Sequence, residues 1–226
     1  MDRRHFGLAA AAAAIGAGGL YFGTRSGGGD PIGVAFAQDA ASAADIDTSG
    51  IAEMSTGNPD AAVTVIEYAS YTCPHCARFH AGPYKQLKTD FIDTGKIKFV
   101  NREVFFDRYG VWAAILARCG NGGAQRYFGI ADMLYERQRQ WAGRGNSAEQ
   151  IVAQLRTIGR TAGLTDAEMD SCFSDADFAR ALVANYEKNA AADYINATPS
   201  FVINGRKYSN MAYDQLRATV ESKLPS

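Results

Sequence analysis

The sequence lacks an excess of charge of either sign, because 23 lysine and arginine residues are balanced by 24 aspartate and glutamate residues, for a net charge of −1. A basic surface for nucleic acid is therefore not expected. The sequence also lacks a glycine-rich phosphate loop and the HExxH pattern of zinc hydrolases. What is present is 47% apolar and 21% charged residues, the composition of an ordinary soluble globular protein.

Cysteine is scarce, with four residues in 226. Two of them, Cys73 and Cys76, are the first and last residues of a Cys-Pro-His-Cys motif. A structural zinc site needs four ligands, usually with a second close pair, and Cys119 and Cys172 lie far apart in the sequence. Covalent haem attachment requires a histidine directly after the second cysteine, where this chain has Ala77. The motif therefore indicates thiol–disulfide chemistry.

The residues around the motif predict its place in the fold. Residues 63–69 have the apolar and β-branched character of a buried strand, and a helical pattern begins near Cys76. At the N-terminus of a helix, unsatisfied N–H groups and the helix dipole favour an anion. Cys73 is thus expected to ionise to a thiolate, which is both a nucleophile and a good leaving group.

The N-terminus has the composition of an export signal. Arg3 and Arg4 precede an Ala/Gly-rich apolar stretch that ends near Phe22, and residues 35–37 offer a small-residue cleavage site. We predict that residues 1–37 are a signal peptide whose Arg-Arg-x-Phe-x-Leu pattern resembles the twin-arginine type. A general secretory leader and an uncleaved membrane anchor are the alternatives, although the apolar stretch is short for a span. Export predicts a periplasmic protein, in a compartment where disulfides persist.

The rest of the chain alternates between strand-like and helix-like stretches. Residues 38–57 are small, polar and without periodicity, which predicts a flexible lead-in. An Asn-Gly pair between two β-rich runs near the C-terminus indicates a hairpin. The predicted elements are, in order, a strand at 63–69, a helix at 73–91 bent at Gly82-Pro83, a strand at 96–104, helices throughout 110–194, a hairpin at 198–208 and a helix at 213–224.

A strand before CxxC, a later Thr-Pro pair before a hairpin and a closing helix together resemble the thioredoxin fold. The long helical stretch between the cysteines and Thr198-Pro199, combined with the Cys-Pro-His-Cys motif, resembles the DsbA family of thiol–disulfide oxidoreductases. The resemblance implies an α/β protein. Its thioredoxin-like domain would span 58–109 and 195–226, with an inserted all-helical subdomain at 110–194.

The resemblance also implies a role for each residue of the motif. Cys73 would be the exposed attacking and leaving sulfur, and Cys76 the buried partner that closes the ring. Pro74 fits the first helical turn, where its missing N–H is not needed. His75 would place a donor or partial positive charge beside the Cys73 thiolate, which stabilises the reduced form and makes the disulfide a stronger oxidant. The alternative for His75 is an exposed residue at a helix start.

Thr198-Pro199 is implied to carry a cis peptide bond, since a cis bond is readily formed only before proline. Pro199 would pack against the cysteine pair and leave the backbone of Thr198 free to pair with a substrate strand. A trans proline at the edge of a strand is the alternative.

Glu67 is a carboxylate in an otherwise apolar strand, six residues before Cys73. A buried carboxylate needs a partner or a raised pKa, and Lys98 or Arg102 on the neighbouring strand is the predicted partner. In the family an acid at this place is thought to carry protons to the buried cysteine. A glutamate that reaches solvent at a strand edge is the alternative.

Cys119 and Cys172 both fall within the predicted helical subdomain. An exported context and an even number of cysteines favour a structural disulfide between them. Two free buried thiols are the alternative.

The predicted function is a periplasmic dithiol oxidase that donates the Cys73–Cys76 disulfide to folding exported proteins through a mixed disulfide on Cys73. The expected partners are unfolded exported proteins and a quinone-linked membrane reoxidase of DsbB type. Neither a cofactor, a metal nor nucleic acid is expected. The protein is expected to be a monomer.

Thr198 favours an alternative function, a disulfide isomerase or reductase, because the family's oxidases often carry valine there. Residues 38–57, however, are too few for the dimerisation domain of such isomerases. A redox-inert chaperone or metal-carrying module is a third hypothesis.

Overall fold

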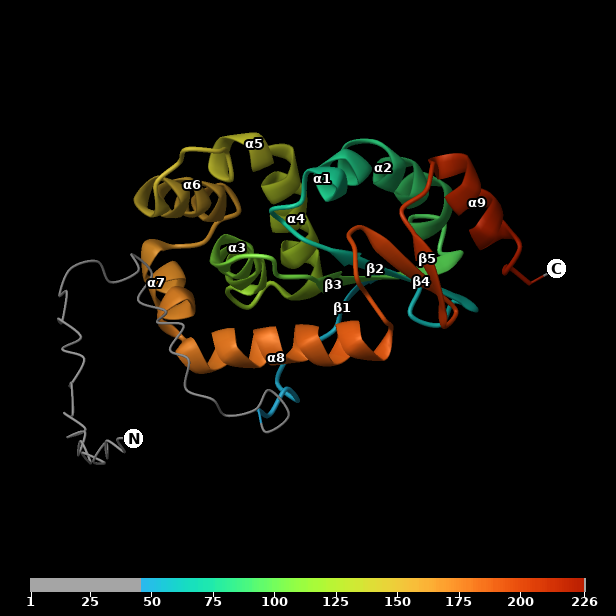
Figure 1. Ribbon diagram of the computed structural model, residues 1–226, viewed down its shortest axis with the longest axis horizontal. Helices are drawn as coiled ribbons and strands as arrows, with labels where there is room; N and C mark the ends of the chain where they lie inside the picture. Colours follow the sequence, from blue (N-terminus) through green and yellow to red (C-terminus); the bar gives the residue numbers. More distant parts are fainter. Residues whose placement is uncertain (1–45, 226) are drawn as a thin grey trace, which may run out of the picture.

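The computed structural model describes residues 46–225, and a five-stranded mixed sheet lies at its centre (Figure 1). The strands are Met54–Gly57 (β1), Val63–Ala69 (β2), Ile97–Glu103 (β3), Ser200–Ile203 (β4) and Arg206–Ser209 (β5). Their order across the sheet is β1-β3-β2-β4-β5, with β2 and β3 parallel and the other neighbours antiparallel. The central strands β2 and β4 are almost entirely buried, which explains their apolar sequences.

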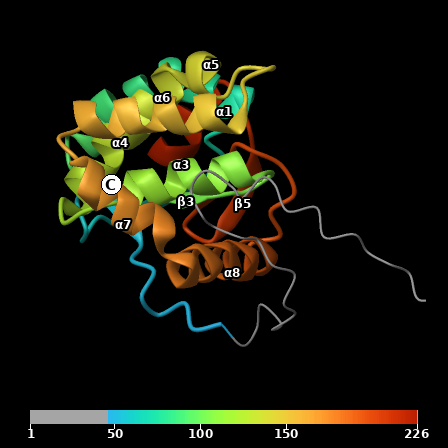
Figure 2. The same ribbon diagram turned by 90° about the vertical axis from the view of Figure 1, so that its left-hand side faces the viewer.

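Helices cover both faces of the sheet and one of its ends. In chain order they are Pro74–Ala81 (α1), Pro83–Leu87 (α2), the π-helical turn Lys88–Ile92 (η2), Arg108–Arg118 (α3), Gly123–Glu136 (α4), Gln138–Trp141 (α5), Ala148–Thr161 (α6), Asp166–Ser174 (α7), Ala176–Ala192 (α8) and Tyr213–Glu221 (α9). Figure 1 shows α1, α2 and α9 along one face, α8 along the other, and α3 to α7 gathered beyond the end where α1 begins. Figure 2 shows the same layers from the side. None of the described helices is long and apolar enough to cross a membrane.

The N-terminal part of the described chain departs from the predicted flexible lead-in over 38–57. Residues 38–45, like the predicted signal peptide at 1–37, lie outside the described residues. Met54–Gly57 form β1 and pair with β3, and Arg118 Nη1 donates to the carbonyl oxygen of Ala52 at 2.8 Å. The prediction is wrong for these residues, because a four-residue edge strand is too short to show periodicity and its order comes from its partner strand.

Proline determines both ends of α1. Cys73 is the N-cap in extended conformation, with φ −83° and ψ 119°, and Pro74 takes the first helical position, where no N–H is needed. Gly82 ends α1 and Pro83 begins α2. The predicted helix over 73–91 is therefore divided into shorter pieces at the glycine and proline where a bend is expected, and the first turn of α1 is held directly after β2.

Residues at and after the start of α1 contribute to two hydrophobic clusters. One lies between the sheet and α1, α2 and α9 and contains Phe79 and Phe99. The other fills the helical part of the molecule around Trp112, and Cys73 and Cys76 belong to it. The cysteine motif thus lies at the junction between the sheet and the inserted helices.

Candidate active site

The cysteine motif combines one sulfur near the surface with one that is enclosed. Cys73 is 8% exposed and Cys76 is 0% exposed, and both thiols are free. The backbone N–H groups of His75 and Cys76 belong to the first helical turn, which has no acceptors within the helix. They donate toward the Cys73 sulfur instead. The local geometry thus favours negative charge on Cys73.

The two sulfurs differ strongly in acidity. The pKa of Cys73 falls to about 5, chiefly because the Cys76 side chain donates to its sulfur. The backbone N–H groups of Cys76 and His75 lower this pKa further, while partial burial offsets only part of the effect. Burial raises the pKa of Cys76 far above its ordinary value, and hydrogen bonding to Cys73 and the charge of Glu67 add to it. At neutral pH Cys73 is therefore a thiolate and Cys76 a thiol.

The loop that leads into β4 lies against Cys73. The peptide bond between Thr198 and Pro199 is cis, and Cys73 Sγ lies 3.6 Å from the Thr198 carbonyl oxygen. Pro199 is buried. Thr198 Oγ1 is also buried and has no hydrogen-bond partner among the described residues. This loop explains why Cys73 is less exposed than an attacking sulfur at a helix start is expected to be.

His75 and Pro74 lie on the exposed side of α1. Nδ1 of His75 is 2.7 Å from Nη2 of Arg78, so the imidazole contacts a guanidinium group one turn along the helix. The backbone N–H of His75 contributes to lowering the pKa of Cys73. A redox role for the imidazole itself stays a prediction.

Glu67 is fully buried in β2, and its partner is His80. His80 Nε2 lies 3.0 Å from Glu67 Oε2, and both side chains are enclosed. The predicted partners Lys98 and Arg102 are wrong, because they are in register with even-numbered residues of β2, whose side chains point to the opposite face of the sheet. One signal in the sequence could have identified His80: it follows Cys76 by four residues, so both lie on one helix face.

Two polar residues that the sequence did not indicate support the loop before the motif. Gln138 is 6% exposed, and its Nε2 donates to the carbonyl oxygens of Tyr71 at 2.8 Å and Cys73 at 2.9 Å. Asp107 accepts a hydrogen bond from Thr72 Oγ1 at 3.0 Å. Gln138 lies in a polar run without apolar periodicity, so only the packing of α5 against the loop reveals its role.

Cys119 and Cys172 form a disulfide bond away from the motif. The Cα atoms are 5.8 Å apart, and the bond joins residues separated by 53 positions. Cys119 is the C-cap of α3 and Cys172 lies in α7. The bond therefore connects α3 with α7, and the structural disulfide favoured by the sequence is present.

A groove of about 800 Å³ runs beside α1. Its walls come from α1, α2, α4 and α5 and include Pro74, His80, Tyr84 and Tyr135. It therefore borders both the start of the cysteine motif and the buried Glu67–His80 pair.

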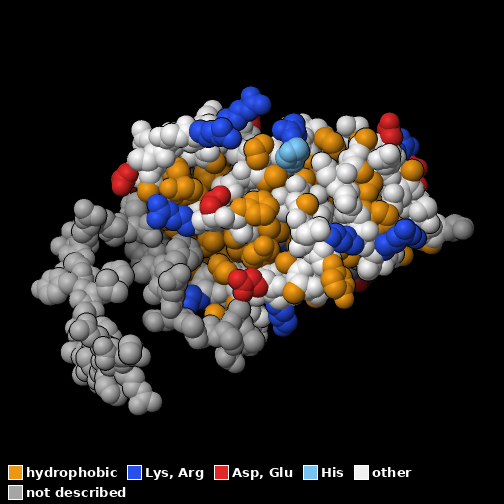
Figure 3. Space-filling model, viewed as in Figure 1, with side chains coloured by type: hydrophobic (Ala, Val, Ile, Leu, Met, Phe, Trp, Pro, Cys, Tyr) orange, Lys and Arg blue, Asp and Glu red, His pale blue; other side chains and the backbone are white. Residues whose placement is uncertain are grey.

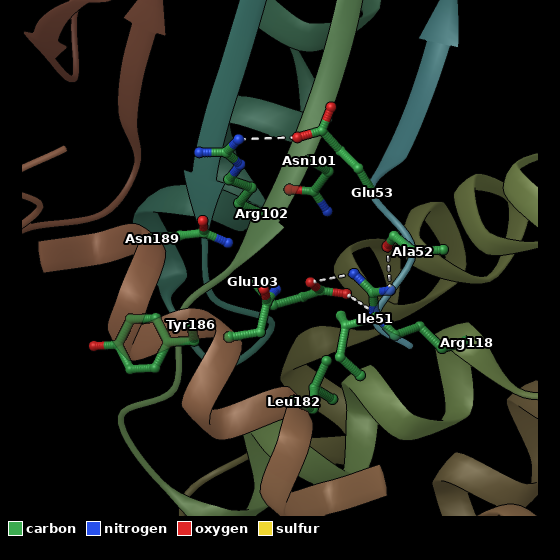
Figure 4. A pocket seen from close by; sticks show the side chains of 11 residues that line it. Ile51, Ala52, Glu53, Asn101, Arg102, Glu103, Arg118, Leu182, Tyr186 and Asn189 are labelled. Atoms are coloured by element: carbon green, nitrogen blue, oxygen red, sulfur yellow. Dashed lines mark hydrogen bonds and ion pairs between the residues drawn. The ribbon is translucent and has the colours of Figure 1, made fainter. Parts of the chain in front are cut away.

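A smaller cavity of about 160 Å³ lies between β3, α3 and α8 (Figure 4). Its charged groups are paired with one another: Arg118 Nε lies 2.7 Å from Glu103 Oε1, and Arg102 Nη2 lies 2.9 Å from Glu53 Oε2. The first pair joins α3 to β3, and the second attaches the residues before β1 to the sheet. Within residues 46–225 there is no group of three or more His, Cys, Asp or Glu side chains that could hold a metal ion.

Comparisons with known proteins agree with this geometry. The family model described as Thioredoxin matches residues 49–222. A Rickettsia bellii protein named as a candidate protein-disulfide oxidoreductase is 33% identical over 172 residues, covering 76% of this chain and 64% of that protein. The chain thus spans less than two thirds of this relative. Disulfide bond formation protein D of Bacillus subtilis is 26% identical over 175 residues, covering 74% of this chain and 75% of that protein.

Among solved structures, that of Wolbachia pipientis alpha-DsbA1 has a TM-score of 0.69 and 24% sequence identity, covering 75% of this chain and 89% of that chain. A likeness at this identity concerns the fold. The predicted thioredoxin-like fold with inserted helices is therefore confirmed, as is the resemblance to DsbA proteins on which that prediction rests.

Proposed function

The chain belongs to the thioredoxin family, and from this membership we propose that it is a protein thiol–disulfide oxidoreductase that donates the Cys73–Cys76 disulfide to folding exported proteins. The observation that carries the proposal is the unequal setting of the two sulfurs: Cys73 is the N-cap of α1 and Cys76 is fully buried, which lowers the pKa of the first and raises that of the second. Reduction of the disulfide produces a stabilised thiolate on Cys73. A pair whose reduced form is stabilised is a strong oxidant.

The proposed reaction passes through a mixed disulfide. A substrate thiolate attacks Cys73 Sγ, the Cys73–Cys76 bond breaks, and its electron pair goes to Cys76 Sγ, which takes up a proton. A second substrate thiolate then attacks the substrate sulfur of the mixed disulfide, and Cys73 leaves as a thiolate. The substrate is oxidised by two electrons and the cysteine pair is reduced by two. Attack is directed to Cys73, because Cys76 has no exposed surface.

The surface beside the motif supports an unfolded polypeptide as substrate. In Figure 3 hydrophobic side chains gather in the middle of the face, over α3 and the loops near the start of α1. Phe106 and Tyr194, in the loops that lead to α3 and β4, are 60% and 82% exposed. Exposed apolar surface of this kind suits the apolar segments of an unfolded chain. The backbone of Thr198, next to Cys73, would pair with an extended segment of that chain.

We also propose that the protein acts in the periplasm as a monomer and is reoxidised by a quinone-linked membrane protein of DsbB type. The support for export is the Arg3-Arg4 pattern of a twin-arginine-like signal within residues 1–37. Retention of that segment as an uncleaved anchor is the alternative. An oxidising compartment would keep the donor pair and the Cys119–Cys172 bond oxidised.

Thr198 favours a second candidate, a disulfide isomerase or reductase. Its hydroxyl is buried next to Cys73 without a partner among the described residues, at the position where the family's oxidases often carry valine. An isomerase would reactivate a substrate with scrambled disulfides, whereas an oxidase would act only on a reduced one. Absence of any exchange would leave a redox-inert chaperone or metal carrier.

Trapping the mixed disulfide tests the proposal. Cys76→Ser, incubated with a reduced, unfolded multi-disulfide protein and with glutathione disulfide as the oxidant, is expected to accumulate a covalent adduct on Cys73, detected by mass spectrometry without reductant. The matched variant Cys73→Ser should form no adduct, because its remaining sulfur is enclosed. Equal adduct formation by both variants, or by neither, contradicts the proposed mechanism.

A further inference from the structure

A buried acid–base pair lies behind the cysteine motif. Glu67 is 0% exposed and His80 is 6% exposed, and their contact of 3.0 Å joins Oε2 to Nε2. Glu67 Oε1 and His80 Nδ1 are also buried and have no hydrogen-bond partner among the described residues. Each side of the pair thus keeps one further atom that can accept or donate a proton.

The proposed reaction needs a proton where water has no access. When the disulfide opens, the electron pair goes to Cys76 Sγ, which is fully buried. An isolated thiolate there is strongly disfavoured. Glu67 is close enough to act on Cys76 by its charge, although burial has the larger effect on the pKa of that thiol. The proton must therefore come from a neighbouring group.

The groove beside α1 connects His80 to solvent. His80, Tyr84 and Tyr135 all line it. The imidazole stacks on Tyr135 with ring centroids 4.0 Å apart and an angle of 16°, and its centroid is 4.5 Å from that of Tyr84. These rings fix the imidazole between the groove and Glu67. It is thus held with its Nε2 against the carboxylate.

We propose that His80 acts through Glu67 as a positioning and proton-transfer residue, relaying a proton from the groove to Cys76 Sγ when the disulfide is reduced. The inference rests on the proposed oxidoreductase function. In the reducing step Glu67 gives a proton to the departing Cys76 sulfur and receives one from His80 Nε2, and His80 regains a proton from water in the groove. In reoxidation the same path removes the proton from Cys76.

The chemistry of histidine distinguishes this pair from the buried pair of Glu103 on β3 and Arg118 on α3. Arginine stays charged at every accessible pH and cannot pass a proton on, whereas imidazole gains and loses one near neutrality. The titratable and charged groups around His80 are, on β2, Glu67; on α1, Cys76 and Arg78; on α2, Tyr84 and Lys85; on η2, Lys88; on α4, Asp132, Tyr135 and Glu136; and on α5, Arg139.

Single-turnover kinetics of the full chain test the relay. The oxidised protein is mixed with dithiothreitol, and the rate of opening of the Cys73–Cys76 bond is followed between pH 5 and 8 in H₂O and D₂O. His80→Gln keeps a donor for Glu67 but cannot carry a proton, so we expect the rate to fall about tenfold or more and the solvent isotope effect to disappear. His80→Ala opens space beside Tyr135, and added imidazole should restore its rate but not that of His80→Gln.

Phe79→Leu is the matched structural control. It alters a buried neighbour in the same helix, whose ring centroid is 5.6 Å from that of His80, without changing the acid–base pair. It should lower stability and retain the wild-type pH profile and isotope effect. A His80→Gln variant with the same pH profile and isotope effect as wild type overturns the relay, even if its stability falls. Failure of wild type itself to react with dithiothreitol would instead refute the proposed function.

Discussion

The two cysteine pairs of this protein use the same side chain for opposite purposes. Cys119 and Cys172 are joined across 53 positions and connect α3 with α7. Cys73 and Cys76 lie within one helical turn, are free, and differ strongly in acidity. The difference comes from the surroundings: the first pair ties helices together, whereas the second lies among N–H donors, a cis-proline loop and a buried carboxylate. Sequence separation and nearby hydrogen-bond donors thus distinguish a structural disulfide from a reactive cysteine pair.

The largest expected effect is the loss of exchange when the reactive sulfur is removed. Cys73→Ser should lower the rate of oxidation of a reduced peptide by at least about 10³-fold, because it removes the only partly exposed sulfur of the motif. The double variant Cys119→Ser/Cys172→Ser should stay within a few fold of wild type. The measurement is the initial rate with the fully oxidised protein. Comparable losses in both variants would remove the distinction between the pairs.

The reverse pattern is expected for stability. Removing the Cys119–Cys172 bond frees a loop closed over 53 positions, and the chain-entropy relation gives a loss of about 4 kcal/mol in the free energy of unfolding. Urea denaturation of Cys119→Ser/Cys172→Ser against wild type measures it, with the Cys73–Cys76 pair oxidised in both samples so that no free thiol exchanges with the Cys119–Cys172 bond. A loss below about 1 kcal/mol in the free energy of unfolding would show that the bond does not stabilise the fold by closing this loop.

The next largest effect is the pH dependence of the reactive pair, which follows from the lowered pKa of Cys73 and has no counterpart in the Cys119–Cys172 bond. The pKa of Cys73 in the folded, reduced protein is about 5, well below the value of about 8.5 for an unperturbed cysteine. The thiolate therefore stabilises the reduced protein fully above about pH 8.5, and this stabilisation is lost as pH falls through the folded value. The denaturation midpoint of the reduced protein should drop relative to Cys73→Ala across that range, and thiolate absorbance at 240 nm should show a midpoint near 5. A midpoint above pH 8 would contradict the assignment.

The smallest expected effect concerns His75. His75→Ser keeps the backbone N–H that acts on Cys73 but removes the imidazole, which is paired with Arg78. We expect the pKa of Cys73 to rise by about one unit, which makes the disulfide less oxidising by about 30 mV. Arg78→Gln is the control, because it keeps the imidazole of His75 and removes the guanidinium group that contacts it. An unchanged potential in His75→Ser would leave only the backbone of this residue with a redox role.

Local sequence signals predicted much of the site, and long-range packing accounts for the rest. The strand, motif and helix around Cys73 follow from sequence patterns within a few residues. Thr198-Pro199 directly precedes the β4–β5 hairpin, as the sequence predicts, and has a cis peptide bond. The partner of Glu67 was predicted wrongly, because a choice between strand neighbours depends on which face each side chain occupies. Gln138 carries no local signal, since its hydrogen bonds span more than 60 positions.

The reduction potential of the Cys73–Cys76 pair tests the central claim most directly. It is measured by equilibration with glutathione buffers in the Cys119→Ser/Cys172→Ser variant, so that only one pair titrates. A stabilised Cys73 thiolate predicts a value well above that of thioredoxin, which is about −270 mV, and closer to the value of about −120 mV for DsbA. A value at or below that of thioredoxin would contradict the account of this pair as a disulfide donor.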